Sequence, residues 1–448
     1  MNETLIVDYK NFLNNGKTER ECVAQIIKSA EKKGYKDISK FKKLKPGDKV
    51  YITKMNKAIA LFHIGLEPID KGLNILGAHI DSPRLDAKQN PLYEKDNITY
   101  LNTHYYGGIK KYQWTTTPLA IHGIICKKDG KTVNVVIGEN NDEPVFCISD
   151  ILPHLAQDQM KDKASDFIKG EDLDVLMGSV GPQKQGDDKD KKADKEKSKK
   201  VILGLLKEMY GVEEEDLQSA ELEIVPAGKA RDMGLDRSMI LGYGQDDRSC
   251  AFSSVAAMLE VNAGARTTCC LCVDKEEIGS VGATGMASNL FENMVSEVIL
   301  RTNDSYSDID LRRCLANSYM LSSDVNAAYD PLNAGLYDKD NASFLGGGVT
   351  FQKYTGSRGK SGASDANPEF VAKVRAAMHD ANVNYQMAEL GKVDQGGGGT
   401  IAYHAARYGM NVLDAGVAVL SMHAPWEITS KEDICQMFEC CKAFLIIK

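Results

Sequence analysis

The sequence predicts an α/β protein in which buried strands are flanked by helices. The first observation is a series of short apolar runs rich in Val, Ile and Cys, at residues 73–78, 268–273, 319–322 and 412–420, the last broken by Asp414 and Gly416. Runs of this kind are typical of strands that are covered on both faces. The second observation is helical patterning at residues 19–33 and 250–259. Together they favour a sheet with helices packed against it.

The other elements follow in chain order. Residues 19–33 alternate apolar and charged side chains near the helical period, which predicts an amphipathic helix. Residues 50–62 predict a strand followed by a second strand or a short helix. Residues 119–126 and 132–137 surround the hairpin signal Asp129–Gly130. Hairpins of this kind favour an antiparallel, β-rich insertion.

A charged, low-complexity segment at residues 184–200 carries both signs of charge and predicts a solvated loop within the insertion. A contact with nucleic acid is the alternative, but the interleaved acids and the lack of aromatic residues disfavour it. Residues 203–210 and 214–220 resume helical patterning.

Composition limits the class of protein. The 448 residues suffice for two domains, and 43% hydrophobic and 26% charged residues are ordinary for a globular protein. A net charge of −8 argues against nucleic acid as a main partner. No run reaches transmembrane length, and no signal peptide is evident. The 11 cysteines, set mostly in apolar runs, indicate reduced thiols, so we expect a cytoplasmic protein.

Five residues of metal-binding type stand next to these predicted elements. They are His79, Asp246, Glu277, Asp324 and His423. Four follow an apolar run and Asp246 precedes a helix, so they are expected to meet at the edge where strands end in open α/β sheets. Taken singly, each has a structural alternative, such as a helix cap for Asp246. Taken together, two histidines and three carboxylates suit two divalent cations such as Zn²⁺ or Mn²⁺.

The neighbours of these residues add chemistry. Asp81 is spaced to accept a hydrogen bond from His79 and to fix its tautomer. Asp246 can offer one oxygen to each of two metals, which lie roughly 3.5–4 Å apart in such sites. Glu276 and Glu277 would point in different directions on an extended backbone, so Glu277 can ligate while Glu276 faces water. The set indicates metal-assisted hydrolysis with Glu276 as general base.

The segments GAHIDSPRL, TYLNTHYYGG, ILPHLAQ, GGGGT and SMHAPWEI, in this order, resemble the M18 metallopeptidases, the family of aspartyl aminopeptidase and aminopeptidase I. The resemblance implies a three-layer α/β/α zinc-exopeptidase-like catalytic domain over residues 1–87 and 238–448. It also implies an inserted, mostly β dimerisation domain over residues 88–237. Family members form tetrahedral dodecamers, so a homo-oligomer is expected.

Carried over position by position, the resemblance also implies the metal ligands. His79 and Asp324 would hold one metal, and Glu277 and His423 the other. Asp246 would bridge both. The implied cofactors are two divalent ions per subunit, zinc first, with manganese or cobalt as alternatives.

The implied activity is that of an aminopeptidase that removes acidic or neutral N-terminal residues from short peptides, with Glu276 as general base and Asp81 orienting His79. An acidic substrate residue would need a cation, for which Lys353, Arg358 and Lys360 are candidates. Peptides are the expected partners, and neither nucleic acid nor a membrane is expected.

Two alternatives and one departure from the family pattern stand beside this interpretation. Another dinuclear amidase, such as a carboxypeptidase, would need an arginine for the substrate carboxylate, and Arg248 or Arg301 could be proposed. A non-catalytic assembly or cargo protein has no need for the metal-binding set.

In PHLAQDQ, His154 is kept, but Asp158 stands where eukaryotic aspartyl aminopeptidases have a histidine that approaches a neighbouring subunit. The resemblance does not extend to that contact.

Overall fold

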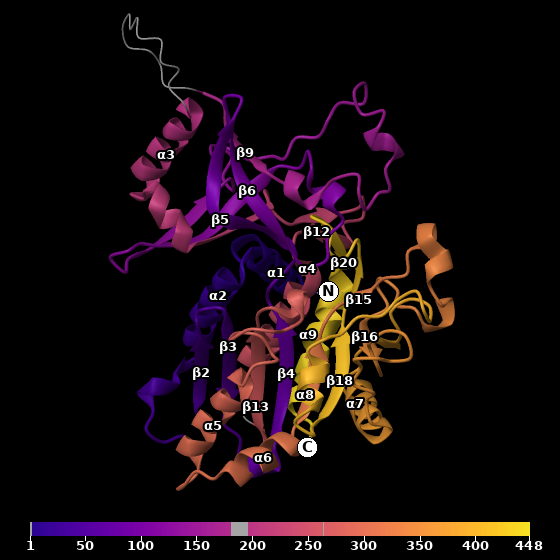
Figure 1. The fold of residues 1–448 in the computed structure, drawn as a ribbon. Coiled ribbons are helices and arrows are strands. Elements are labelled where there is room, and N and C mark those ends of the chain that lie inside the picture. The colour runs from indigo at the N-terminus through magenta and orange to yellow at the C-terminus, as the bar shows by residue number, and fades with distance from the viewer. Residues whose placement is uncertain (1, 181–195, 263) are drawn as a thin grey trace, which may run out of the picture. The chain divides into compact units, whose positions relative to one another are not determined.

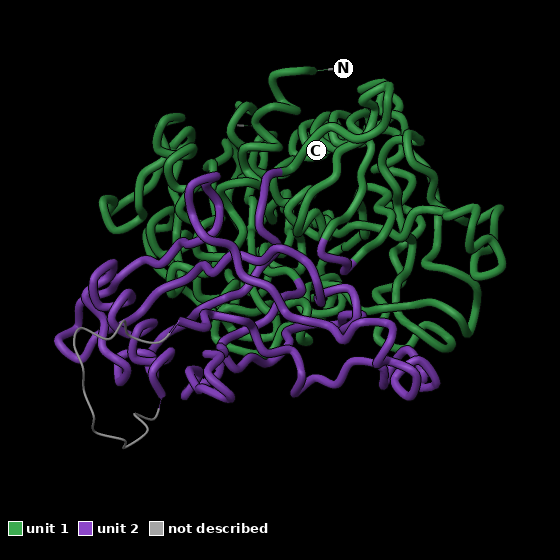
Figure 2. The backbone as a smooth tube through the Cα atoms, turned by 90° about the horizontal axis from the view of Figure 1, so that it is seen from above, with its two compact units in different colours: residues 1–82, 230–422, 426–448 green, residues 83–229, 423–425 purple. Residues whose placement is uncertain are grey.

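The computed structural model describes residues 2–180, 196–262 and 264–448, which form two compact units (Figure 2). The first unit contains residues 1–82, 230–422 and 426–448, and the second contains residues 83–229 with 423–425. The main segment of the second unit, 83–229, begins and ends earlier in the chain than the predicted insertion of 88–237. Among the described residues, no helix is long and apolar enough to cross a membrane.

The first unit is built on a nine-stranded sheet whose central strands are parallel (Figure 1). In spatial order its strands are β1 (Lys36–Asp37), β2 (Lys49–Lys54), β3 (Ala58–His63), β13 (Thr267–Val273), β4 (Leu73–His79), β14 (Tyr319–Ser323), β18 (Asn411–Gly416), β16 (Val349–Gln352) and β17 (Tyr385–Met387). Strands β13, β4, β14 and β18 pair in parallel. Their carboxyl ends therefore meet at one edge, as the apolar runs predict.

Helices cover both faces of this sheet. One hydrophobic core contains residues of α1 (Glu3–Asn15), α2 (Glu19–Lys32), α4 (Gln245–Glu260), α7 (Pro368–Asp380) and α9 (Lys431–Leu445). A second core contains residues of α5 (Leu290–Thr302), α6 (Asp308–Ala316) and α8 (Ala402–Ala406). Within β13, Cys269 belongs to the second core and Cys272 to the first, so the two thiols face opposite ways. The result is the predicted three-layer α/β/α arrangement.

A smaller five-stranded sheet completes the first unit. Its order is β11 (Arg231–Met233), β12 (Met239–Gly242), β20 (Glu427–Ser430), β19 (Ala418–Leu420) and β15 (Asn326–Ala327). The apolar run at 412–420 is thus two strands, β18 and β19, divided at Val417. The chain changes sheets there, directly after Gly416, one of the two residues that interrupt the apolar run.

The second unit is β-rich, as the hairpin signals predict. Its six-stranded antiparallel sheet has the order β8 (Thr132–Ile137), β7 (Leu119–Cys126), β10 (Ala220–Pro226), β5 (Arg84–Lys95), β6 (Ile98–Tyr106) and β9 (Val175–Gly178). The predicted hairpin is β7–β8. Inside the sheet, the buried Arg84 lies 3.1 Å from Glu223 and 4.0 Å from the centre of the Tyr106 ring.

Several sequence predictions are confirmed and others need correction. Helix α2 begins after Thr18, which forms a capping box with Glu21 and explains why the helix starts there. The loop predicted at 184–200 is wrong at its end, because residues 197–200 are the first turn of helix α3 (Lys197–Tyr210), while 184–195 lie outside the described residues. The helical segment predicted at 214–220 is a 3-10 helix, Glu214–Ser219.

Candidate metal centre

Three side chains meet at the carboxyl edge of the main sheet. His79 is the last residue of β4, and Asp324 directly follows β14. These strands pair in parallel with Ser322 opposite Gly77, so both side chains leave the sheet at the same level. Asp246 comes from the first turn of α4, where its backbone is not helical (φ −84°, ψ 108°). Two strands and one helix thus bring the three residues together.

The distances suit a shared ion. His79 Nε2 lies 3.2 Å from Asp246 Oδ1 and 3.8 Å from Asp324 Oδ1. One ligand atom from each of the three lies within 4.8 Å of the others, and all three residues are buried. Zinc binds imidazole nitrogen and carboxylate oxygen at about 2.0–2.2 Å, so atoms with this spacing can surround one ion.

Asp81 connects His79 to the turn that follows β13. His79 Nδ1 lies 3.4 Å from Asp81 Oδ1 and 3.1 Å from the Asp81 carbonyl oxygen. The two carboxylate oxygens of Asp81 accept the backbone N–H groups of Glu276 and Glu277, each at 3.2 Å. Asp81 therefore orients the histidine ring through its carbonyl and carboxylate oxygens, and its carboxylate also holds the acidic turn.

Glu276 and Glu277 lie in a 3-10 turn, Glu276–Ile278, and not on the extended backbone for which different side-chain directions are expected. Residues in the left-handed region flank the turn, Lys275 (φ 73°) before it and Gly279 (φ 90°) after it. An oxygen of Glu277 lies within 4.8 Å of one of Asp246. Glu276 Oε2 lies 3.9 Å from His79 Nε2. The turn thus places both glutamates beside the three-residue cluster.

Burial perturbs the charges of this cluster. Burial raises the pKa of Asp324 well above its ordinary value. Burial lowers the pKa of His79, but its hydrogen bonds with Asp246 and Asp81 outweigh this and raise the pKa overall. Several buried carboxylates in one cluster are stable as anions only when a cation compensates their negative charge. The donor set, imidazole with carboxylates, fits a divalent ion such as zinc.

His423 follows β19 in the chain and is grouped with the second unit. Its backbone is in the left-handed region (φ 65°), and its Nδ1 lies 2.8 Å from the carbonyl oxygen of Gly108. A ring N–H donated to that carbonyl leaves Nε2 as the nitrogen able to bind a metal.

Glu427 is a functional candidate that the sequence interpretation missed. This acid is 1% exposed, and its Oε2 accepts the backbone N–H groups of Gln245 (2.6 Å) and Asp246 (3.1 Å). Ser82 Oγ donates to the Asp246 carbonyl at 2.6 Å, and the Tyr9 hydroxyl holds the neighbouring side chain by donating to Gln245 Oε1 at 2.9 Å. The backbone around Asp246 is therefore fixed by hydrogen bonds from several elements.

The cations considered for an acidic substrate are partly neutralised. Lys360 lies 3.1 Å from Asp365 and 3.7 Å from the centre of the Tyr354 ring, and Lys353 lies 3.8 Å from Asp365. Arg358 lines a cavity of about 220 Å³ together with Lys360. Two of the three cations therefore already have an acidic partner.

The arginines that a carboxypeptidase would need are engaged elsewhere. Arg248 is fully buried and donates to the Lys17 carbonyl at 2.9 Å. Arg301 pairs with Glu297 on its own helix and donates to the Phe41 carbonyl at 2.9 Å. In the second unit, His154 is exposed and Asp158 forms an exposed ion pair with Lys161.

Comparison with known proteins identifies relatives of this chain. Residues 12–445 match the family model described as aminopeptidase I zinc metalloprotease (M18). A probable M18 family aminopeptidase 1 of Clostridium acetobutylicum is 57% identical over 98% of this chain and 93% of its own. The crystal structure of an M18 aminopeptidase from Thermotoga maritima covers 100% of this chain and 98% of its own, with a TM-score of 0.95 and 40% identity. That of aminopeptidase I from Clostridium acetobutylicum has a TM-score of 0.90 and 54% identity, covering 98% and 94%. At 21% identity, the mApe1 dodecamer of S. cerevisiae shares the fold, with a TM-score of 0.76 over 98% of this chain and 95% of its own.

Proposed function

The chain belongs to the M18 family of aminopeptidase I zinc metalloproteases, and from this premise we propose that it removes N-terminal residues from short peptides with two divalent ions and a glutamate base. The observation that carries the proposal is the buried cluster of His79, Asp246 and Asp324 beside the Glu276–Glu277 turn. It supplies imidazole and carboxylate ligands next to an acid that can exchange protons.

In this proposal His79 and Asp324 would hold one ion, and Glu277 and His423 would hold the other. Asp246 would be a ligand shared by both sets. The contacts within 4.8 Å among His79, Asp246 and Asp324 support the first set, and the proximity of Asp246 to Glu277 supports the second. The ions, zinc with manganese or cobalt as alternatives, supply polarisation of the scissile carbonyl and a lowered pKa of water.

Glu276 is proposed as the general base. Its side chain is 17% exposed, so it reaches solvent, and its backbone N–H is held by Asp81. Glu276 takes a proton from the attacking water and then donates it to the leaving amine. Asp81 holds the ring of His79 through Nδ1, so that Nε2 faces the carboxylates.

A neutral N-terminal residue is favoured over an acidic one. Lys353 and Lys360 share the single carboxylate of Asp365, which offsets part of the positive charge that would bind an acidic substrate side chain. The engaged Arg248 and Arg301 disfavour a carboxypeptidase, which must bind a free substrate carboxylate.

We also propose a homo-oligomer, a dodecamer by likeness to the yeast neighbour, in which the second unit provides contacts between subunits. Ile151, Leu152, Leu155 and Met160 of that unit expose between 46% and 69% of their surface, which supports an interface there. A cytoplasmic location is proposed because all 11 cysteines are free thiols. Light scattering that finds a monodisperse monomer would contradict the oligomer.

Initial rates on aminoacyl-p-nitroanilides of Leu, Lys, Asp and Glu test the function. The enzyme is assayed after chelation and again after addition of Zn²⁺, Mn²⁺ or Co²⁺, with N-acetylated substrates as the matched control. We expect metal-restored cleavage of the free-amine substrates alone, fastest for Leu. Cleavage of the acetylated substrates, or no cleavage with any metal by folded protein, would overturn the proposal.

A further inference from the structure

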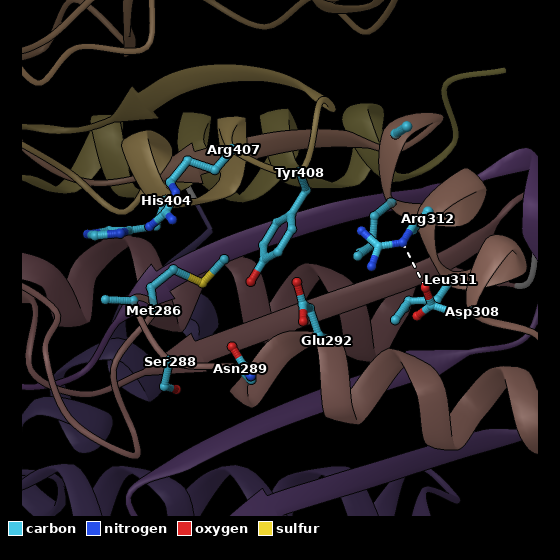
Figure 3. A pocket seen from close by; sticks show the side chains of 13 residues that line it. Met286, Ser288, Asn289, Glu292, Asp308, Leu311, Arg312, His404, Arg407 and Tyr408 are labelled. Carbon is cyan, nitrogen blue, oxygen red and sulfur yellow. Dashed lines mark hydrogen bonds and ion pairs between the residues drawn. The ribbon is translucent and has the colours of Figure 1, made fainter.

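A second polar cavity lies in the first unit, away from the residues proposed for catalysis. It has a volume of about 410 Å³ and contains none of the proposed metal ligands or the proposed base (Figure 3). Its walls come from residues 286–289 before α5, from α5 and α6, and from residues 404–408 at the end of α8. The volume is within the range of sites that hold small molecules.

Opposite charges line this cavity without neutralising each other. The exposed Arg407 and the half-buried Glu292 both line it, and within the described residues neither makes a hydrogen bond or an ion pair. The neighbouring cation, Arg312, is already paired with Asp308 at 2.8 Å. Figure 3 shows Arg407 and Glu292 in different parts of the cavity, with the Tyr408 ring between them. A ligand that carries both charges would satisfy both groups.

Neutral polar groups stand beside these charges. The Tyr408 hydroxyl points toward the Glu292 carboxylate in Figure 3. The Nδ1 atom of His404 is buried and has no hydrogen-bond partner within the described ranges. Burial, and then the charge of Arg407, lower the pKa of His404, so its ring is neutral at pH 7 and can both donate and accept. An unpartnered buried nitrogen is costly unless a ligand or water bonds to it.

We propose that this cavity binds a small zwitterion, an amino acid or a dipeptide. The ligand ammonium binds Glu292, and the ligand carboxylate binds Arg407, whose long, exposed side chain turns past the Tyr408 ring to reach it. Arginine suits the second role because its planar fork matches a carboxylate. The proposed peptidase reaction also releases ligands of this class. A role of the cavity in sensing that product would rest on the proposed function. Binding itself does not depend on it.

Isothermal titration of the metal-loaded enzyme with L-leucine tests the site. Two analogues serve as chemical controls, isoamylamine without the carboxylate and N-acetyl-leucine without the ammonium. The same titrations are run on Glu292→Gln and Arg407→Gln. Arg313→Gln is the matched control, because Arg313 lies on α6 but does not line the cavity. Repeating the series on chelated protein separates this site from leucine bound at the metals.

We expect saturable binding of leucine on chelated and metal-loaded protein, with far weaker binding of either analogue. Glu292→Gln and Arg407→Gln should each raise the dissociation constant about tenfold or more, as loss of a charged hydrogen bond does. Arg313→Gln should leave it unchanged, and all three variants should cleave nitroanilides normally. The circular dichroism of each variant verifies its fold.

Three results would overturn the inference. One is the absence of leucine binding to chelated protein. Another is equal binding by the variants or by the single-charge analogues. The third is a change of oligomeric state, measured by light scattering, in Glu292→Gln or Arg407→Gln while leucine binding is unaffected. That result would show that the cavity is part of an interface between copies of the chain. If the enzyme cleaved no nitroanilide, the titrations could still be interpreted, because ligand binding requires no turnover.

Discussion

Glu427 accepts a hydrogen bond from the backbone N–H of Asp246 at 3.1 Å, although the two acids are 181 residues apart in the chain. The same carboxylate oxygen accepts the N–H of Gln245 at 2.6 Å. Both N–H groups lie in the first turn of α4, where the helix itself offers them no carbonyl partner, and Glu427 at the start of β20 supplies an acceptor. A buried acid that is not a proposed ligand therefore fixes the position of one that is.

Glu427→Gln should weaken metal binding about 10- to 100-fold, the usual cost of losing a group that orients a ligand. The amide lacks the negative charge that strengthens the hydrogen bonds from the N–H groups of Gln245 and Asp246. Competition with a chromogenic chelator measures the change, and Glu439→Gln on the exposed face of α9 is the control. Unchanged affinity in folded Glu427→Gln would show that this contact does not set the position of Asp246.

Gly416→Ala should disturb the edge of the sheet at Asp324. A Cβ at Gly416 would lie 1.8 Å from the Asp324 carbonyl oxygen, which belongs to the backbone and cannot move aside freely. We expect a loss of about 1–3 kcal/mol of stability, typical of overpacking, and weaker metal binding.

Gly77→Ala is the matched comparison for that variant. A Cβ at Gly77 would lie 2.2 Å from Met320 Cε, the far end of a flexible side chain that can rotate away. Chemical denaturation and chelator competition on both variants test the contrast. Equal losses of stability would show that the backbone at Asp324 moves aside as readily as the Met320 side chain.

Asp433 predicts a pH dependence of stability. Its buried carboxylate accepts the N–H groups of Gly346 and Gly348, each at 2.8 Å, and burial raises its pKa to about 7. Because the native pKa lies above the unfolded value of about 3.9, the native state binds the extra proton. The stabilising contribution is complete below about pH 4 and is lost as the pH rises toward 7.

Thermal unfolding between pH 5 and 8 measures this effect against Asp433→Asn, which does not titrate. Relative to the variant, the unmodified protein should lose stability as the pH rises, most between pH 5 and 7. Asp380→Asn, at an exposed site, should show no such trend. A difference between Asp433→Asn and the unmodified protein that stays constant with pH would contradict the account.

The sequence predicts the layers well because the apolar runs that end at His79 and Asp324 are local signals of buried strands. It does not predict Glu427, since that acid bonds to backbone N–H groups and leaves no pairing pattern of side chains. The turn at Glu276 was missed for a related reason. Its shape depends on the Asp81 carboxylate, which lies far away in the chain.

The most direct test of the two-metal account with a glutamate base is metal content and turnover measured on one sample of Glu276→Gln. Elemental analysis should find two ions per subunit, as in the unmodified enzyme, while kcat falls about 10²- to 10⁴-fold, the usual contribution of a general base. Glu277→Gln, assayed in parallel, should instead lose metal. Turnover near that of the unmodified enzyme in Glu276→Gln, or a single ion per subunit in the unmodified enzyme, would contradict the account.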